Sequence, residues 1–156
     1  MVELRRYELV KISKLKPYKR NARKHSQQQL EQIANSIREF GFVNPVLVDS
    51  DFNVIAGHGR ILAAQDVGMT ELPCIFVEDL TDEQRRAYIL ADNRLTELGG
   101  WDDKILQLEL ADLGDMGFDI SLTGFGTPDF EPVDQSEQPR LDEKKLITCP
   151  HCGEEF

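Results

Sequence analysis

The sequence has little cysteine and no long hydrophobic run. Its 156 residues include only three cysteines, too few for a disulfide framework, and this favours a reducing compartment. No apolar stretch approaches the roughly 20 residues that a transmembrane helix needs. The basic N-terminus is not followed by the apolar segment of a signal peptide. We therefore expect a cytoplasmic protein with no membrane partner.

Positive and negative charges are also distributed unevenly along the chain. The formal net charge is −10, but residues 1–25 hold nine Lys and Arg residues against two Glu residues, which gives this segment +7 and leaves −17 on the remainder. An acidic body repels DNA phosphates unless the basic residues form one patch. The basic N-terminal segment is therefore either a DNA contact or a solvated edge strand and loop.

The pattern of apolar residues predicts one small α/β domain over residues 1–125. Apolar alternation and short apolar runs predict strands at 7–12, 46–48, 54–56 and 72–77. Helical spacing predicts helices at about 26–40, 58–67, 82–98 and 104–113. Ser26 with Gln29 fits a capping box, Thr81 and Asp102 fit N-caps, and Gly41 fits a helix stop.

The hydrophobic pattern stops after Gly126. Residues 126–146 are rich in Pro, Asp, Glu and Gln, which predicts a disordered acidic linker. Residues 147–156 form a separate knuckle in which Cys149 and Cys152 make a CxxC pair. Zinc prefers four ligands, so this half site would bind Zn²⁺ shared with a second chain, as a homodimer, or with a partner protein. The alternatives are zinc bound within one chain, an unmetallated remnant and a redox pair. Cys74 is predicted to be buried in a strand and does not complete the site.

The most informative stretch joins a buried strand to a helix through Gly57-His58-Gly59-Arg60. Such a junction leaves the first helical N–H groups unpaired at the positive end of the helix dipole. Glycine permits close approach of an oxyanion, and Arg60 can supply a bidentate cation. The turn is therefore either a phosphate site or a tight turn that needs glycine for its geometry. His58 alone is either a polar surface residue or a catalytic candidate.

Two stretches of the chain resemble ParB N-terminal domains. The first is Asn21-Ala22-Arg23-Lys24-His25 followed by residues 30–48, and the second runs from Ile55 through the glycine turn to Leu72-Pro73. Together they cover roughly residues 7–98 in the order and spacing of the family. The resemblance implies the ParB/sulfiredoxin fold, a small mixed sheet with flanking helices, whose glycine-arginine turn binds nucleotide phosphates. It also implies NTP (ATP or CTP) with Mg²⁺ as the bound cofactor.

The chain is most similar to a subgroup that adds three further motifs: Arg86-Ala87-Tyr88-Ile89-Leu90-Ala91-Asp92-Asn93-Arg94, Gly100-Trp101-Asp102 and Leu122-Thr123-Gly124-Phe125. Domains with this extension often precede a DNA methyltransferase domain in bacteria and phages, or stand alone in phage-like elements. The resemblance implies an accessory to DNA modification or to another mobile-element DNA process. Its partner would be a DNA methyltransferase or another DNA-processing protein.

This sequence differs from the family pattern at several positions, and these differences limit which family properties we expect it to share. His58 stands where sulfiredoxins have their catalytic cysteine, which excludes cysteine-based reduction of a sulfinic acid. Partition ParB proteins have Glu and Arg where this chain has His58 and Gly59, so the base of the nucleotide is left open. After Leu98 we expect one good helix and an acidic tail rather than a helix-turn-helix region, and therefore no sequence-specific partition clamp.

The candidate site follows from these matches. The predicted phosphate- and nucleotide-binding residues are Gly57, His58, Gly59, Arg60, Asn21, Arg23 and Asn93, and the catalytic candidates are His58 and Asp92. Asp92 and Asn93 either face the pocket, where they could hold Mg²⁺ or a ribose hydroxyl, or lie on a solvated helix face. His25 either belongs to the site or simply ends the basic loop.

Three functions remain open from the sequence. The first is a nucleotide-binding, DNA-associated module. The second is an enzyme of the ParB-like nuclease, NTPase or phosphotransferase kind, with candidate carboxylates at Asp49, Asp51, Glu78, Asp79 and Asp92. The third is a non-catalytic interaction adaptor in which the turn is vestigial.

Overall fold

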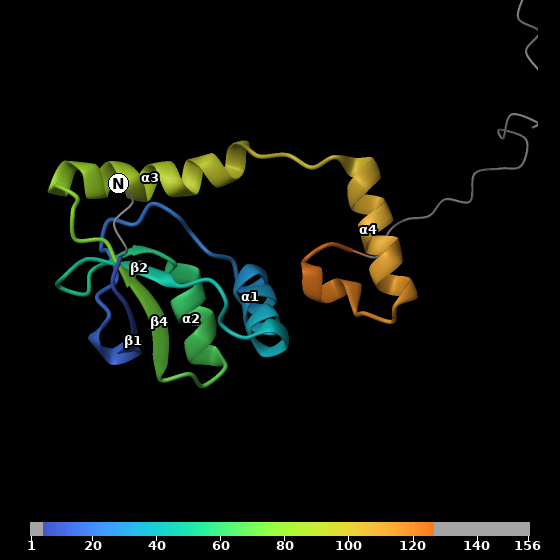
Figure 1. The fold of residues 1–156 in the computed structure, drawn as a ribbon, viewed down its shortest axis with the longest axis horizontal. Helices are drawn as coiled ribbons and strands as arrows, with labels where there is room; N and C mark the ends of the chain where they lie inside the picture. Colours follow the sequence, from blue (N-terminus) through green and yellow to red (C-terminus); the bar gives the residue numbers. More distant parts are fainter. Residues whose placement is uncertain (1–4, 127–156) are drawn as a thin grey trace, which may run out of the picture.

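The computed structural model describes residues 5–126, which form a four-stranded sheet with helices on both faces (Figure 1). The strands are β1 (Tyr7–Lys11), β2 (Val46–Val48), β3 (Val54–Ala56) and β4 (Glu71–Phe76), arranged in the order β1-β4-β2-β3. Strand β4 pairs antiparallel with β1 and parallel with β2, while β2 and β3 form an antiparallel hairpin. The expected mixed sheet with flanking helices is confirmed.

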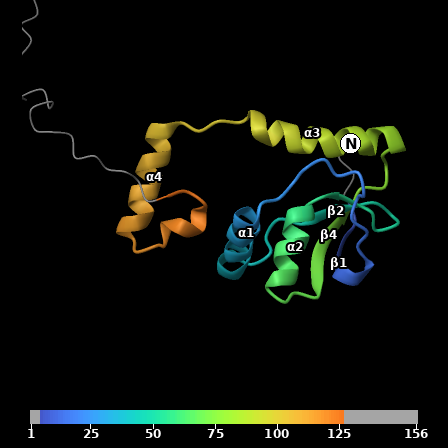
Figure 2. The same cartoon turned by 180° about the vertical axis from the view of Figure 1, so that it is seen from behind.

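Each face of the sheet is covered by different helices. Helices α1 (Gln27–Phe40) and α2 (His58–Asp66) lie on one face, and α3 (Asp82–Leu98) lies across the other, as both views show (Figures 1 and 2). The larger core cluster includes buried side chains of all four strands together with Ile61 and Ala64 of α2. A smaller cluster joins Ile55 of β3 to Ile89 of α3. The sheet therefore fixes β3 and its exit turn between two packed layers.

The two edges of the sheet differ. On β1, Tyr7 and Leu9 are 60% and 66% exposed. On β3 all three residues are buried, and the chain before α1 covers the outer side, where Lys16 exchanges backbone hydrogen bonds with Phe52 and Val54 at 2.9 Å. The start of the basic loop is thus held directly against the strand that leads into the glycine turn.

The helix caps follow the predictions with one exception. Thr81 and Gln84 form a complete capping box at α3, and Asp102 caps α4 (Asp103–Asp115) by accepting from two backbone N–H groups. Gly41 ends α1 with φ 78°. At α1, Ser26 accepts from the Gln29 N–H, but the Gln29 side chain bonds His25 instead of closing the box.

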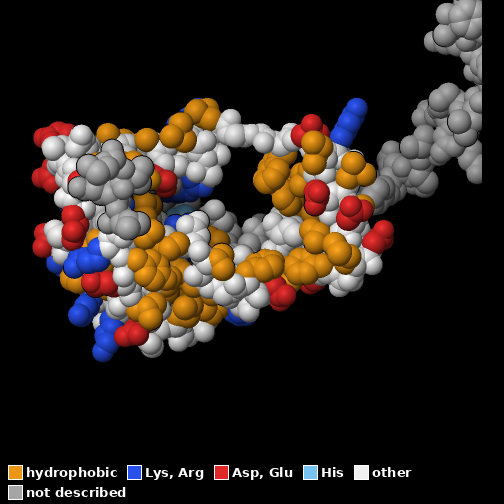
Figure 3. Space-filling view, viewed as in Figure 1, with side chains coloured by type: hydrophobic (Ala, Val, Ile, Leu, Met, Phe, Trp, Pro, Cys, Tyr) orange, Lys and Arg blue, Asp and Glu red, His pale blue; other side chains and the backbone are white. Residues whose placement is uncertain are grey.

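Beyond α3 the chain crosses a short connector to α4 and then returns toward α1 through η2 (Ile120–Thr123), as Figure 1 shows. This 3₁₀ turn and η1 (Ile12–Lys14) were not predicted. Phe118 stacks on Phe40 of α1 at 5.9 Å between ring centroids. The predicted apolar character of α4 does not lead to complete burial, because Leu110 is 7% exposed whereas Leu108 is 66% exposed. Hydrophobic side chains are accordingly visible on the surface of the molecule in Figure 3.

No helix in the described part of the chain combines the length and apolarity that crossing a membrane requires. The predicted linker over 126–146 lies outside the described residues from position 127 on, as does the Cys149–Cys152 knuckle.

Candidate functional site

The turn after β3 is built as an uncapped helix start. Gly57 adopts a left-handed conformation with φ 101° and ψ 20°, and the first hydrogen bond of α2 runs from the Ile61 N–H to the Gly57 carbonyl at 3.0 Å. The N–H groups of His58, Gly59 and Arg60 precede that bond and have no intrahelical acceptor. No described side chain caps this end of α2. Donors and helix dipole together make the turn an anion-binding geometry.

Arg60 lies against the turn rather than away from it. A Cβ atom built on Gly57 would lie 3.1 Å from Nη2 of Arg60, so the missing side chain makes room for the guanidinium. Nη2 donates to the Pro45 carbonyl at 3.2 Å, while Nε is buried without a partner among the described residues. Burial lowers the pKa of Arg60 and the charge of Asp92 raises it. An arginine remains a cation at neutral pH under such a shift.

Gly59 is needed for a different contact. The ring of His25 lies on it so closely that an added Cβ would be 2.9 Å from Cε1 of His25. The Nδ1 atom of His25 lies 3.0 Å from Oε1 of Gln29, which fixes the ring at the start of α1. The contact brings the loop before α1 directly over the first turn of α2.

His58 anchors the basic loop. Its Nε2 accepts a hydrogen bond from the Tyr18 backbone N–H at 3.1 Å, a bond that requires Nε2 to be unprotonated. Burial lowers the pKa of His58, and the nearby His25 lowers it further. In this arrangement His58 is neutral with its proton on Nδ1, and only Nδ1 is available for proton transfer.

Arg23 connects the loop to α3. Its Nη1 donates to Oδ1 of Asn93 at 3.2 Å, and Asn93 in turn donates from Nδ2 to the Ile89 carbonyl at 2.8 Å. Asn21 accepts from the Arg23 backbone N–H at 3.1 Å and shapes the loop. Because both ends of the Asn93 amide are engaged, Asn93 positions Arg23.

All these groups line one pocket of about 190 Å³ at the turn. It contains every residue predicted for nucleotide binding, and Asp92 beside them. His25, Gln29 and Thr96 also line it. Sequence reasoning left His25 open and did not single out Gln29 or Thr96 as site residues, although Thr96 lies four residues after Asp92 on the same face of α3.

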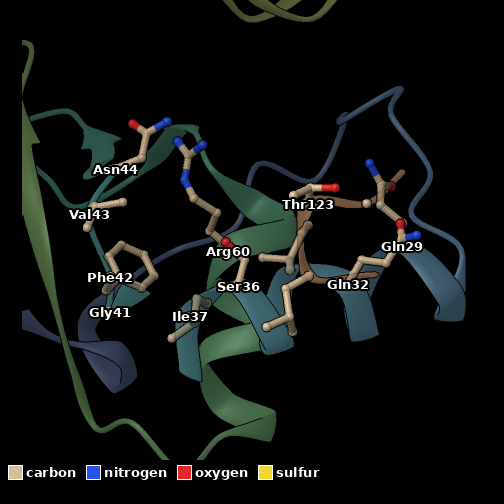
Figure 4. Close-up of a pocket in the computed structure, with 13 residues that line it drawn as sticks. Gln29, Gln32, Ser36, Ile37, Gly41, Phe42, Val43, Asn44, Arg60 and Thr123 are labelled. Carbon is tan, nitrogen blue, oxygen red and sulfur yellow. The ribbon is translucent and has the colours of Figure 1, made fainter. Parts of the chain in front are cut away.

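A second pocket, of about 450 Å³, adjoins the first (Figure 4). It lies between α1, residues 41–44 and η2, and Arg60 rises from α2 into it between the Asn44 and Thr123 side chains. The two pockets share Gln29, Ile33 and Arg60.

The carboxylates proposed for a nuclease are largely paired with arginines. Asp79 receives two hydrogen bonds from Arg5, at 2.7 and 3.0 Å. Asp49 accepts from Arg85 and from the side chain and backbone of Asn53. Between residues 5 and 126 no group of three or more His, Cys, Asp or Glu side chains could hold a metal ion.

The expected burial of Cys74 is confirmed, because it is fully buried in β4 and burial raises the pKa of its thiol to about 11. A protonated, buried thiol is a poor metal ligand and a poor nucleophile.

Some basic residues of the N-terminal segment form contacts within the folded domain. Arg5 pairs with Asp79, Arg6 pairs with Glu78 at 3.0 Å, and the Arg6 guanidinium lies 3.6 Å from the centre of the Phe76 ring. Arg23 is bound to Asn93. Within the described chain, the remaining basic residues of the segment form no ion pair, and they are Lys11, Lys14, Lys16, Lys19, Arg20 and Lys24.

Residues 2–94 match the family model of the ParB N-terminal domain, more than half of the chain and all of the sheet. The chain belongs to this family. Residues 104–144 match a second model, the ParB-methyltransferase HTH domain, so the ParB N-terminal domain is followed by a helix-turn-helix domain of that type. The expectation of one helix and an acidic tail after Leu98 missed this domain. The match begins within α4 and crosses the boundary predicted after residue 125.

Relatives include the ParB-like nuclease domain-containing protein YnaK of Escherichia coli K12. This ParB-family chain is 47% identical to it over 75 residues, which cover 48% of the chain and 86% of the relative. A chromosome-partitioning protein Spo0J of Thermus thermophilus is 34% identical over 86 residues, which cover 53% of the chain. These matches cover only about a third of the partitioning relatives, 32% of Spo0J.

The fold is shared with a C-terminally truncated chromosome-partitioning protein ParB from Caulobacter crescentus. That structure, a complex with CTP-gamma-S, matches with a TM-score of 0.62 over 74% of this chain and 73% of that one, at 22% identity. The ParB-like fold inferred from the sequence is thereby confirmed.

Proposed function

We propose that this ParB-family chain is a nucleotide-binding, DNA-associated module that is accessory to DNA modification or to another mobile-element DNA process. In this proposal the Gly57–Arg60 turn binds the phosphates of ATP or CTP, and the helix-turn-helix domain contacts DNA. The partner is a DNA methyltransferase or another DNA-processing protein. The uncapped start of α2, with Arg60 packed on Gly57, is the observation that carries the proposal.

Phosphate binding would use groups that already converge. The N–H groups of His58, Gly59 and Arg60 can donate to phosphate oxygens at the positive end of α2. Arg60 adds a guanidinium held in place by the Pro45 carbonyl, so little ordering is needed on binding. The Caulobacter relative in complex with CTP-gamma-S supports a nucleotide as the ligand class.

Mg²⁺ would accompany the phosphates. Asp92 is the carboxylate that lines the pocket, and it acts on the charge of Arg60. Oxygen ligands from one carboxylate and from phosphates are the arrangement that Mg²⁺ prefers. Asn93 would contribute through Arg23, which its side chain holds.

The DNA contact rests on two parts of the chain. The helix-turn-helix domain supplies the class of element that enters a DNA groove. The lysines of the basic segment, which are free of ion pairs with described residues, can add phosphate contacts. The Cys149–Cys152 pair remains a predicted half site for Zn²⁺ shared across a homodimer.

A nuclease is the second candidate because the Escherichia coli relative carries that word in its name. A two-metal nuclease needs clustered carboxylates, whereas Asp79 and Asp49 are engaged by arginines. Incubation with plasmid DNA and Mg²⁺ tests this candidate. Cleavage that disappears in Asp92→Asn would favour it over a binding module.

The proposal is tested by calorimetric titration of the full chain with ATP and CTP, each with and without Mg²⁺. Arg60→Ala should weaken binding by about 10- to 100-fold, because a charge-assisted hydrogen bond contributes about 1.5–3 kcal/mol. Arg60→Lys should recover part of the loss. Arg86→Ala is the matched control, since Arg86 is exposed on α3 and lines neither pocket.

Equal affinities of Arg60→Ala and the unchanged chain would contradict a role for the turn. If no nucleotide bound at any accessible concentration, and DNA binding persisted, an adaptor with a vestigial turn would be the better description.

A further inference from the structure

Strand β1 is the outermost strand of the sheet, and within the described chain it pairs with β4 alone (Figure 1). Near one end of β1, the Phe76 N–H donates to the Arg6 carbonyl at 2.9 Å. Near the other end, the Ile12 N–H donates to the Thr70 carbonyl at 2.9 Å. In an antiparallel pair, residues bonded to the neighbouring strand alternate with residues whose N–H and C=O groups point to the other side. The even-numbered residues of β1 therefore face β4, and the odd-numbered residues face outward.

The outward-facing residues of β1 are Tyr7, Leu9 and Lys11. Pro73 of β4, which has no N–H, lies opposite Leu9, in keeping with a position at which the two strands exchange no hydrogen bond. The side chains of Tyr7 and Leu9 are largely exposed, on the face of the sheet opposite to that of the buried Val10. This outer edge thus combines backbone donors and acceptors that no described group engages with exposed apolar side chains.

The partner that this edge fits is a second copy of β1. When two β1 strands run antiparallel and are centred on Leu9, that residue lies opposite Leu9 of the partner subunit. Tyr7 then lies opposite Lys11 of the partner subunit, where an ammonium group beside an aromatic ring is favourable. Glu8 lies opposite Val10 of the partner subunit. Every outward residue of the strand is paired, and no two like charges face each other.

The charges of β1 disfavour the neighbouring registers. A register centred on Glu8 places two glutamates directly opposite each other, and a register centred on Lys11 does the same with two lysines. Like charges in such positions destabilise a strand pair. Registers centred on Tyr7 or Val10 pair only part of the strand, because their outward residues extend past its ends. The arrangement centred on Leu9 is therefore the one that the sequence of β1 favours.

We propose that two copies of the chain associate through antiparallel pairing of β1 with β1, with Leu9 on the two-fold axis. The two four-stranded sheets then become one continuous sheet. The Gly57–Arg60 turn follows β3, at the opposite edge of each sheet, so the pairing leaves the candidate site of both copies accessible. The inference is independent of the proposed function and of the Cys149–Cys152 pair.

Sedimentation equilibrium of the full chain tests the association, in buffer that contains EDTA and neither nucleotide nor DNA. A concentration-dependent equilibrium between one copy and two copies is expected. EDTA removes any association that depends on zinc bound by the predicted Cys149–Cys152 half site.

Leu9→Lys and Leu9→Glu should each weaken the association about 10-fold, because each variant places like charges opposite each other at the centre of the pair. An equimolar mixture of the two variants should associate again, since opposite charges then face each other. Leu95→Lys and Leu95→Glu are the matched controls on α3, because Leu95 is 67% exposed and Leu9 is 66% exposed. Both controls should associate as the unchanged chain does.

Leu9→Pro is a second variant in case the charged variants do not fold. Proline is tolerated on an edge strand where the missing N–H faces outward, so this variant should keep the circular dichroism spectrum of the fold and lose the association. A single copy at every concentration would overturn the proposal. Association that persists in Leu9→Lys, or that is lost in the Leu95 variants instead, would place the contact elsewhere and overturn it as well. A mixture of Leu9→Lys and Leu9→Glu that fails to associate would contradict the two-fold pairing at Leu9.

Discussion

Gly57 and Gly59 occupy the same turn but are required for different physical reasons. Gly57 has a left-handed backbone and leaves space for the Arg60 guanidinium, so a side chain there would be strained and would collide. Gly59 is required only by the His25 ring that lies on it. The two positions should therefore respond differently to substitution.

Gly59→Ala is expected to lower stability by about 1–3 kcal/mol, the usual cost of overpacking, because its Cβ would lie 2.9 Å from the His25 ring. Removing the ring should relieve much of this destabilisation. The free energy of unfolding of Gly59→Ala, His25→Ala and the double variant, measured in urea, gives the coupling. Strictly additive effects would mean that the ring does not press on Gly59.

His58 predicts a dependence of stability on pH. Its pKa in the folded chain is lowered by burial and by His25, so the unfolded chain binds more protons as the pH falls. Stability contributed by neutral His58 is present above its ordinary pKa, near 6.5, and decreases as the pH falls through the lower folded value. Denaturation midpoints between pH 7.5 and 5 measure this decrease.

His58→Gln is the control for that titration. A glutamine oxygen can still accept from the Tyr18 N–H but takes up no proton in this range. The variant should show a flatter profile between pH 7.5 and 5. An unchanged slope would assign the effect to other groups.

At the scale of elements, Asp49 ties three segments together. Its carboxylate accepts from the Asp51 and Asn53 backbone N–H groups, from the Asn53 side chain and from Arg85 of α3. Phe52, inside this hairpin, has an unfavourable left-handed backbone with φ 64°. Burial opposes the ionisation of Asp49, but these hydrogen bonds and the Arg85 charge outweigh it and lower its pKa.

Asp49→Ala should destabilise the chain by about 2–4 kcal/mol, since it leaves the Asp51 and Asn53 donors without their acceptor and removes the buried partner of Arg85. Arg85 also pairs with Asp82, whose side chain is 81% exposed, so Asp82→Ala provides the matched comparison and should cost under about 1 kcal/mol. Urea denaturation of both variants distinguishes the buried pair from the exposed one. Similar destabilisation of both variants would contradict the central role of Asp49.

The elements were predictable because each carries a local signal. The alternating residues of β1, the apolar stripe of α1 and the glycine after it sufficed to place them. The strand order could not be predicted, because pairing of β1 with β4 joins segments about 65 residues apart. The short turns η1 and η2 have no periodic signal.

The part of the candidate site at the Gly57–Arg60 turn was predictable from the sequence, whereas the contacts that surround the turn were less predictable. Gly57 and Arg60 follow from a strand that runs through glycine into a helix. The contacts of His58 with Tyr18 and of Arg23 with Asn93 span 40 and 70 residues, and no local pattern encodes them. The linker predicted from composition after Gly126 overlaps the helix-turn-helix match, which extends to residue 144.

At the scale of the whole molecule, the acidic charge determines how DNA can be approached. With a net charge of −10, the proposed DNA contact would have to be local, and the lysines and Arg20 of the basic segment are candidates for it beside the helix-turn-helix domain. Lys19→Ala, Arg20→Ala and Lys24→Ala combined should weaken DNA binding and reduce its logarithmic salt slope by about 0.9 for each DNA phosphate that these side chains no longer neutralise.

Arg5→Ala with Arg6→Ala is the comparison for that triple variant. These arginines are paired with Asp79 and Glu78, so their removal should lower stability and leave the salt slope nearly unchanged. Affinity for duplex DNA measured from 50 to 300 mM salt would reveal the difference. A slope that fell equally in both variants would mean that no patch exists.

The two edge strands of the sheet, β1 and β3, differ in a way that limits how copies of the chain can associate. The backbone of Lys16 occupies the outer edge of β3 with two hydrogen bonds. No described segment pairs with the outer edge of β1, which ends at the charged residue Lys11. Among residues 5–126, strand-to-strand pairing between molecules can therefore begin only at β1, and the described sheet offers no second open edge strand for further pairing. This part of the chain thus permits a pair of molecules joined through β1 but not continued strand-to-strand growth.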